Sequence, residues 1–129
     1  MQITTFLMFS GRAEEAMTFY VSLFPDSRIA SIVRYGEGGP GAAGTVHQAV
    51  LELAGMRLMC IDSPVKHAFD FTPSISLFVN CDDVAQLDRL VDALSLDGKT
   101  LMPPNNYGFS RKFAWVQDRF GVSWQLNLP

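Results

Sequence analysis

The stretch that decides the fold is the last one in the chain, DRFGVSWQLNLP, residues 118–129. Its apolar members alternate with its polar members. The apolar ones are Val122, Trp124, Leu126 and Leu128, and the polar ones are Ser123, Gln125 and Asn127. Alternation with a period of two is typical of a β-strand that buries one face. The polar side of this strand faces either bulk water or a cavity that binds a ligand.

The elements upstream of this strand predict a helix and several more strands in each half of the chain. In the first half we expect strands at 2–9, 27–35, 45–53 and 57–62, and a helix at 10–25 that Ser10 or Gly11 caps and Pro25 ends. In the second half we expect strands at 74–81, 99–102, 111–118 and 122–128, and a helix at 82–98 that Asp82 caps.

The two halves therefore repeat one order of elements, a strand, a helix and three strands. A constant offset matches Thr5 with Ser76 and Tyr20 with Val91. One βαβββ unit of this size buries too little apolar surface to be stable alone, so two must pack together. The sequence predicts the α+β class, with modules at residues 1–64 and 65–129 forming one compact domain.

Composition excludes several classes of partner and compartment. The 129 residues carry a net charge of -3, which argues against nucleic acid because phosphate binding needs a basic face. No apolar stretch approaches the ~20 residues that cross a bilayer, and the N-terminus lacks the basic start of a signal peptide. Cys60 and Cys81 lie far apart on apolar strands, which favours buried thiols over a disulfide. We expect a cytoplasmic protein with no membrane partner.

The order of elements, together with AMTFYVSLFPDSRI (residues 16–29) and DRFGVSWQL (residues 118–126), resembles the vicinal oxygen chelate superfamily. That superfamily includes glyoxalase I, bleomycin-resistance and fosfomycin-resistance proteins and extradiol dioxygenases. Within it, the chain is similar to the PhnB-like branch, often labelled demethylubiquinone methyltransferase-like. The resemblance implies curved mixed sheets around a cavity, with a helix on the convex side of each sheet. It also implies a homodimer.

Metal-dependent members of the superfamily place their ligands at matching points on the first and last strands of each module. In this chain those points are Thr5, Met59, Ser76 and Gln125. Hydroxyls, a thioether and an amide carry no charge, whereas divalent metals prefer carboxylates, imidazoles and thiolates. The chain has 2 histidines, His47 and His67, and neither stands at a position that the family uses for metal. We therefore predict no metal and no other cofactor.

The resemblance also implies a set of inward-facing side chains that bind a small organic molecule. The set is Thr5, Leu7, Arg57, Met59, Ser76, Phe78 and Gln125. An apolar and aromatic wall with few polar groups suits a neutral or anionic ligand. Ser76 and Gln125 would orient a carbonyl or hydroxyl, and Arg57 a carboxylate. Structural alternatives stay open: core packing for the apolar members, a backbone hydrogen bond for Gln125, and pairing with Glu52 or Asp62 for Arg57.

The residues leave the catalytic question open. His47 is the candidate for a general base, and its alternative is a structural or surface role. No nucleophile elbow, Walker A motif or dinucleotide fingerprint is present, so the methyltransferase label has no support in the residues. Three functions remain: a metal-free binding protein for a small organic molecule, a glyoxalase- or dioxygenase-type enzyme with an atypical site, and methyl transfer to a quinone-like substrate.

Overall fold

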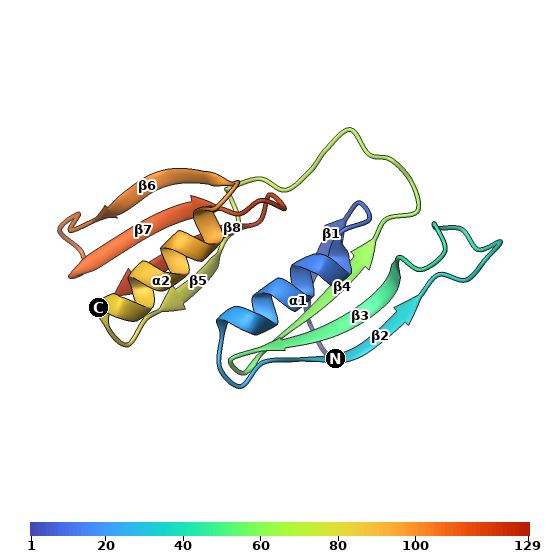
Figure 1. The fold of residues 1–129 in the computed structure, drawn as a ribbon, viewed down its shortest axis with the longest axis horizontal. Coiled ribbons are helices and arrows are strands. Elements are labelled where there is room, and N and C mark those ends of the chain that lie inside the picture. Colours follow the sequence, from blue (N-terminus) through green and yellow to red (C-terminus); the bar gives the residue numbers. More distant parts are fainter. The chain divides into compact units, whose positions relative to one another are not determined.

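The computed structural model describes residues 1–129, which form two compact units, Met1–His67 and Ala68–Pro129. Each unit holds a four-stranded sheet with one helix against it (Figure 1). The predicted α+β class with tandem βαβββ modules is confirmed. The division between the units follows His67, slightly beyond the boundary after residue 64 that the sequence predicts.

The first unit comprises β1 (Thr5–Phe9), α1 (Ala13–Leu23), β2 (Arg28–Arg34), β3 (Val46–Leu53) and β4 (Met56–Asp62). The second comprises β5 (Leu77–Asn80), α2 (Val84–Ser95), β6 (Lys99–Asn105), β7 (Lys112–Gln117) and β8 (Ser123–Leu128). The strand orders are β1-β4-β3-β2 and β5-β8-β7-β6. In both sheets the first and last strands of the module pair in parallel and the others pair antiparallel.

Helix α1 buries one apolar stripe and is capped from a distant strand. The stripe consists of Ala13, Ala16, Met17 and Tyr20. At its start, Asp62 Oδ1 accepts hydrogen bonds from the backbone N–H groups of Gly11 (2.7 Å) and Ala13 (2.9 Å). The predicted cap at Ser10 or Gly11 is therefore wrong, because the carboxylate that satisfies the helix N-terminus comes from β4.

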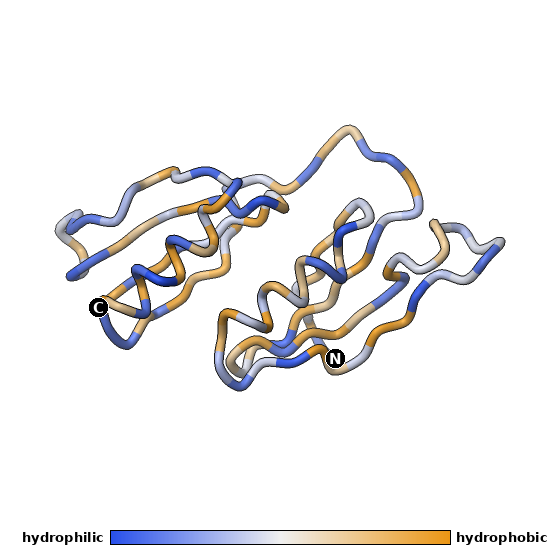
Figure 2. Tube along the Cα trace, viewed as in Figure 1, coloured by the Kyte–Doolittle hydropathy of each residue, from blue (hydrophilic) through white to orange (hydrophobic).

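Helix α2 is capped locally and shows the clearer amphipathic pattern. Asp83 Oδ1 accepts a hydrogen bond from Gln86 N at 2.8 Å, so the cap is Asp83 and the prediction of Asp82 is off by one residue. The buried stripe consists of Leu87, Leu90, Val91 and Leu94. Orange and blue segments alternate along this helix in Figure 2, as an apolar face and a charged face require. Neither helix of the structure is long and apolar enough to cross a membrane.

Strand β6 is longer than predicted, because it continues through Pro103 and Pro104 to Asn105. Proline lacks a backbone N–H group, so it is tolerated where one side of a strand has no partner. β6 stands at the edge of its sheet, where that condition holds, and its register with β7 shifts twice. The segment 103–105, which the sequence places in a loop, therefore belongs to this edge strand.

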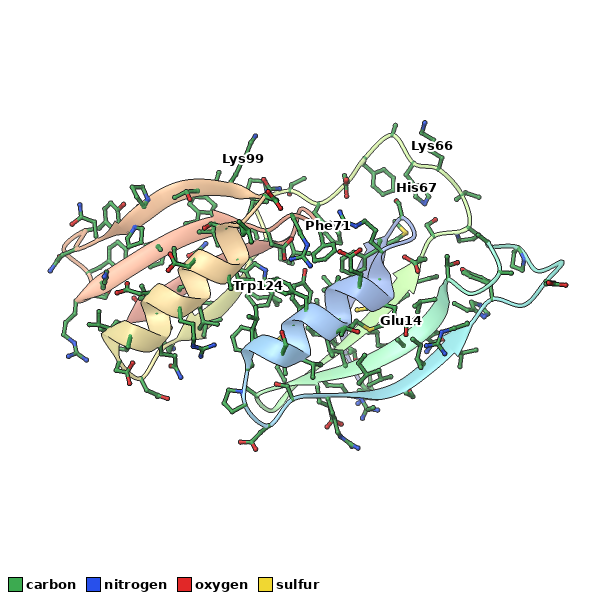
Figure 3. All side chains as sticks on the ribbon, viewed as in Figure 1. Glu14, Lys66, His67, Phe71, Lys99 and Trp124 are labelled. Atoms are coloured by element: carbon green, nitrogen blue, oxygen red, sulfur yellow. The ribbon has the colours of Figure 1, made fainter.

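The stretch 118–129 forms a turn and β8, and Asp118 organises both. Its Oδ1 accepts hydrogen bonds from Phe120 N (2.9 Å) and Val122 N (3.0 Å), and its Oδ2 accepts one from Trp124 Nε1 (2.9 Å). Asp118 is buried, and so is Trp124, which Figure 3 labels. The predicted apolar face of this strand is confirmed, because Val122, Trp124, Leu126 and Leu128 are all buried.

Candidate functional site

The first sheet has one face that α1 covers, and two of the predicted site residues lie on it. Asp62 bonds the start of α1, so Leu58 and Cys60, which precede it at alternate positions of β4, mark the covered face. The register pairs Thr5 with Leu58 and Leu7 with Cys60. Leu7 is buried and Thr5 is half-buried. The prediction that these two line the same surface as Met59 is therefore wrong, because alternate strand residues point to opposite faces.

The side of each sheet opposite its helix, here called the open face, carries equivalent residues in the two units. The register pairs Phe6 with Met59 in the first sheet and Phe78 with Gln125 in the second. Phe6 is 54% exposed and Phe78 is 55% exposed. The sequence offset that matched Thr5 with Ser76 is therefore wrong by one residue for β1 and β5. The residue of β1 that lies on the open face is Phe6 and not, as predicted, Thr5.

Arg57 lies on the open face of the first sheet, two positions before Met59, and has no ion-pair partner. The carboxylate of Glu52 instead accepts a hydrogen bond from Arg28 Nε at 3.0 Å. The carboxylate of Asp62 is engaged by main-chain amides, including Val46 N at 2.8 Å. Arg57 thus forms an ion pair with neither of the two acidic residues considered for it, although Glu52 stands opposite it in the strand register, and its side chain is exposed.

In the second unit, Lys112 identifies the face of the sheet that α2 covers, because its Nζ donates to Asp88 Oδ1 on α2 at 2.7 Å. The open face is the opposite one. The residues of β7 and β8 that alternate with the helix side therefore share the opposite face, together with Ser76 and Phe78 from the β5 side. The open face of the second sheet comprises Ser76, Phe78 and Asn80 on the β5 side, Lys99, Met102 and Asn105 of β6, Phe113, Trp115 and Gln117 of β7, and Ser123, Gln125 and Asn127 of β8.

A continuous chain of hydrogen bonds crosses this face. Trp115 Nε1 donates to Ser123 Oγ at 2.8 Å, and Ser123 Oγ lies 2.7 Å from Ser76 Oγ. Gln125 Nε2 donates to Ser76 Oγ at 3.3 Å. The structure thus brings together Ser76, Phe78 and Gln125 of the predicted set. The side chain of Gln125 bonds another side chain rather than the backbone group that the structural alternative supposed.

An aromatic cluster of Phe78, Tyr107, Phe109 and Phe113 borders the hydrogen-bonded chain. Phe113 is buried, and its ring centroid lies 5.0 Å from that of Phe109, 6.2 Å from that of Tyr107 and 6.4 Å from that of Phe78. The Tyr107 hydroxyl donates to the Pro103 carbonyl at 2.5 Å, which fixes its ring against the cluster. Phe78 and Phe109 are mostly exposed, so the cluster presents aromatic surface outward.

His47, the candidate general base, lies in the first unit beside a register shift in β3. Its ring stacks on that of Tyr35, with centroids 4.8 Å apart and planes at 24°. Tyr35 in turn donates its hydroxyl hydrogen to the Asp62 carbonyl at 3.0 Å. His47 is exposed and has no hydrogen-bonded nucleophile or carboxylate, so its surroundings match the structural alternative.

The two thiols are free and buried, as the sequence predicts. Burial raises the pKa of Cys60 to about 12, and the negative charge of Asp62 adds to the effect. Burial also raises the pKa of Cys81. A thiol whose pKa is raised stays protonated near neutral pH, so neither is an activated nucleophile.

The family model of 3-demethylubiquinone-9 3-methyltransferase matches residues 1–127. The chain belongs to this family. The PhnB protein of Bacillus cereus, provisionally described as such a methyltransferase, is 54% identical to the chain, with 100% of both chains covered and a TM-score of 0.97. This PhnB-like chain therefore belongs to the vicinal oxygen chelate superfamily, as predicted.

More distant solved structures share the fold of this PhnB-like chain. Protein PA1353 of Pseudomonas aeruginosa is 27% identical, with 99% of this chain and 97% of that one covered and a TM-score of 0.84. The fosfomycin resistance protein FosX of Listeria monocytogenes, in complex with Mn(II) and sulfate, is 8% identical, with 99% and 89% covered and a TM-score of 0.62. Among curated proteins none matches the chain.

The residues of this PhnB-like chain do not fit a dication at the positions where the superfamily binds one. Three of the four predicted positions lie on the open faces and hold the thioether of Met59, the hydroxyl of Ser76 and the amide of Gln125, while Phe6 stands there in place of Thr5. These groups offer one soft sulfur and two neutral oxygens, too little to replace the hydration shell of a divalent cation. Nowhere in the structure do three His, Cys, Asp or Glu side chains gather around one point.

The sequence interpretation of this PhnB-like chain missed the part that β7 plays in the open face. Phe113, Trp115 and Gln117 alternate with Ala114 and Val116 in KFAWVQ, the same period of two that identified β8. Trp115 is half-buried and bonds the polar chain. The signal was present, but in a strand that is apolar on both faces it does not say which face is open.

Proposed function

We propose that this PhnB-like chain binds a small organic molecule on the open face of the second sheet and uses no catalytic metal there. The observation that carries the proposal is the hydrogen-bonded chain of Trp115, Ser123, Ser76 and Gln125 next to exposed aromatic rings. Mostly apolar surfaces with a few convergent polar groups are typical of small-molecule sites. Lys99, opposite Gln117 on the edge strand β6, is the one charged member of the face, and the side chains beside Ser76 and Gln125 are uncharged, which suits an uncharged ligand.

Binding is tested by NMR on 15N-labelled protein with a set of uncharged aromatic fragments. The expected result is a shift of the Trp115 indole N–H signal and of the Gln125 side-chain amide signals. Phe78→Ser should remove these shifts, because it takes away the exposed ring beside Gln125. The matched control is Val33→Ser, an equally exposed apolar position on the first sheet. Fragments that leave both signals unmoved would contradict the proposal.

The metal part of the proposal has a separate test. Isothermal titration with Mn²⁺, Ni²⁺ and Zn²⁺ should give no stoichiometric heat, because Met59 and Gln125 offer no charge to a dication. One ion bound per chain, lost in Gln125→Ala, would overturn this part and favour the alternative of a glyoxalase- or dioxygenase-type enzyme with an atypical site.

Methyl transfer, which the family description names, is not part of this proposal. The Gly-rich segment 36–44 connects β2 to β3, two antiparallel strands. Nucleotide-type cofactors are held by a glycine-rich turn between a strand and the N-terminus of a helix. Thermal unfolding with and without S-adenosylmethionine should give the same midpoint, and a saturable upward shift would restore methyl transfer as a candidate.

We further propose that the chain is a homodimer in a reducing compartment such as the cytoplasm. Exposed apolar side chains of the first unit, such as Phe6 and Val33, support an apolar partner surface, and the free thiols support a reducing milieu. Light scattering after size-exclusion chromatography should give twice the 14.3 kDa chain mass, and a 14.3 kDa particle would contradict the dimer.

A further inference from the structure

The hydrogen bonds on the open face of the second sheet have only one consistent direction. The indole N–H of Trp115 can only donate, so Ser123 Oγ accepts from it. Ser123 is 2% exposed, and its own hydroxyl hydrogen therefore needs an acceptor inside the protein. The acceptor within reach of this hydrogen is Ser76 Oγ, 2.7 Å from Ser123 Oγ. Ser123 must consequently donate to Ser76.

This direction leaves Ser76 with a free hydrogen and no free lone pair. Its oxygen accepts from Ser123 and from Gln125 Nε2, which uses the two acceptor positions of a hydroxyl. Its hydrogen has no acceptor in the chain. Groups that donate to one another in a chain polarise each other, so the hydroxyl of Ser76 is a stronger donor than that of an isolated serine. Ser76 therefore offers a donor, and only a donor, to a ligand.

Gln125 supplies the complementary group beside it. One hydrogen of its amide nitrogen is used by Ser76, 3.3 Å away, while its carbonyl oxygen Oε1 has no partner within the chain. Ser76 and Gln125 are both half-buried, so each is reachable and each gains from being bonded. A donor and an acceptor thus stand next to each other on the same face.

The ring of Phe78 sets the shape of the molecule that meets this pair. Phe78 stands opposite Gln125 in the strand register and is 55% exposed. Its ring continues into the aromatic cluster through Phe113 at 6.4 Å. Aromatic surfaces of this kind favour flat conjugated rings through stacked or edge-on contacts.

We infer, resting on the proposed function, that the ligand class is a neutral aromatic amide, whose carbonyl accepts from Ser76 and whose N–H donates to Gln125 Oε1. A carboxylate would set a second oxygen against Gln125 Oε1, and an ammonium would set a hydrogen against the hydroxyl of Ser76. Either mismatch leaves a polar group of the protein unpaired. That loss discriminates between ligands more strongly than a change in the shape of their apolar parts does.

The inference is tested by isothermal titration of the intact protein with three probes. 1-Naphthamide carries the carbonyl and the N–H, N,N-dimethyl-1-naphthamide keeps only the carbonyl, and 1-naphthoate is an anion. We expect 1-naphthamide to bind about tenfold more tightly than either of the other two, the effect of one well-placed hydrogen bond.

Two variants connect the preference to the named hydroxyl. Ser76→Ala should lower the affinity for 1-naphthamide about tenfold, and Ser76→Thr, which keeps the hydroxyl, should restore most of it. Ser31→Ala is the matched control, because this exposed serine of β2 belongs to the first sheet and not to the face that carries this pair. Circular dichroism verifies that each variant is folded, and if Ser76→Ala is not, the comparison of the three probes on the natural protein decides by itself.

The outcomes separate this inference from the proposed function. Equal affinity for the three probes, with binding lost in Phe78→Ser, would overturn the amide preference and leave small-molecule binding in place. Tighter binding of 1-naphthoate would also overturn it. No binding of any probe, together with unmoved Trp115 and Gln125 signals in the fragment experiment, would remove both.

Discussion

Asp118 shows how much of this fold can depend on one side chain. Its carboxylate accepts from two backbone amides of the turn and from the indole of Trp124. Asp118→Asn should destabilise the protein by about 1–3 kcal/mol, because the amide places N–H hydrogens against donors that are buried. Urea unfolding measures this. Asp97→Asn is the control, since Asp97 is exposed in a left-handed turn (φ 59°) that Asn also tolerates, and an equal loss there would contradict the prediction.

Cys60 makes the protein sensitive to alkali. Its pKa is raised from the ordinary 9.0 to about 12 by burial, so between these values the unfolded chain loses a proton that the folded protein keeps. Stability should therefore fall as the pH rises above about 9, and by about 1 kcal/mol at pH 10 from this thiol alone. Urea midpoints of the natural protein and Cys60→Ala between pH 7 and pH 10 measure it. Parallel pH profiles for the two proteins would refute the assignment.

The junction between α2 and β6 depends on a close approach at Gly98. A Cβ atom at this position would overlap the Gln117 carbonyl oxygen and would lie 2.9 Å from the Asp118 carbonyl carbon, both of the backbone. Gly98→Ala should therefore cost about 1–3 kcal/mol, since backbone cannot move aside as a flexible side chain does. Gly36→Ala, with nothing within 4 Å, is the control and should change stability little. Thermal unfolding compares them, and similar midpoints would show that the junction yields.

Strand faces were predictable only where polar residues mark them. In β8 a polar residue alternates with each apolar one, and both faces were assigned correctly. In β1 the run FLMF, residues 6–9, is apolar at every position, so its periodicity does not say which residues meet α1. For that reason the prediction placed Thr5 and Leu7 on the same face as Met59, whereas they lie on the face that α1 covers. The cap that Asp62 provides for α1 was also hidden, because it joins residues far apart in sequence.

The two units of the chain should depend on each other for stability. Each is a single helix on one side of a four-stranded sheet. Domains this small bury a modest share of their surface and are marginal alone. The fragments 1–67 and 68–129 should each lack a cooperative thermal transition, and mixing them should restore one. Cooperative melting of either fragment by circular dichroism would contradict this.

The repeat, by contrast, was predictable because it rests on the order of elements rather than on identities. Helix and strand periods alternate in the same order in both halves, and each element was placed to within a few residues. The polar chain on the second sheet needed the structure, because Ser76 and Ser123 are brought within hydrogen-bond distance only by the parallel pairing of β5 with β8.

The 2 tryptophans of the chain stand in opposite environments of one sheet. Trp124 is in the core and bonded to a carboxylate, while Trp115 is half-buried on the open face and bonded to a hydroxyl. Their emission therefore reports on different events. A titration without an added dye, followed at the red edge of the tryptophan emission spectrum, would detect a ligand bound beside Trp115. Loss of the blue-shifted emission would show that solvent has reached the core around Trp124.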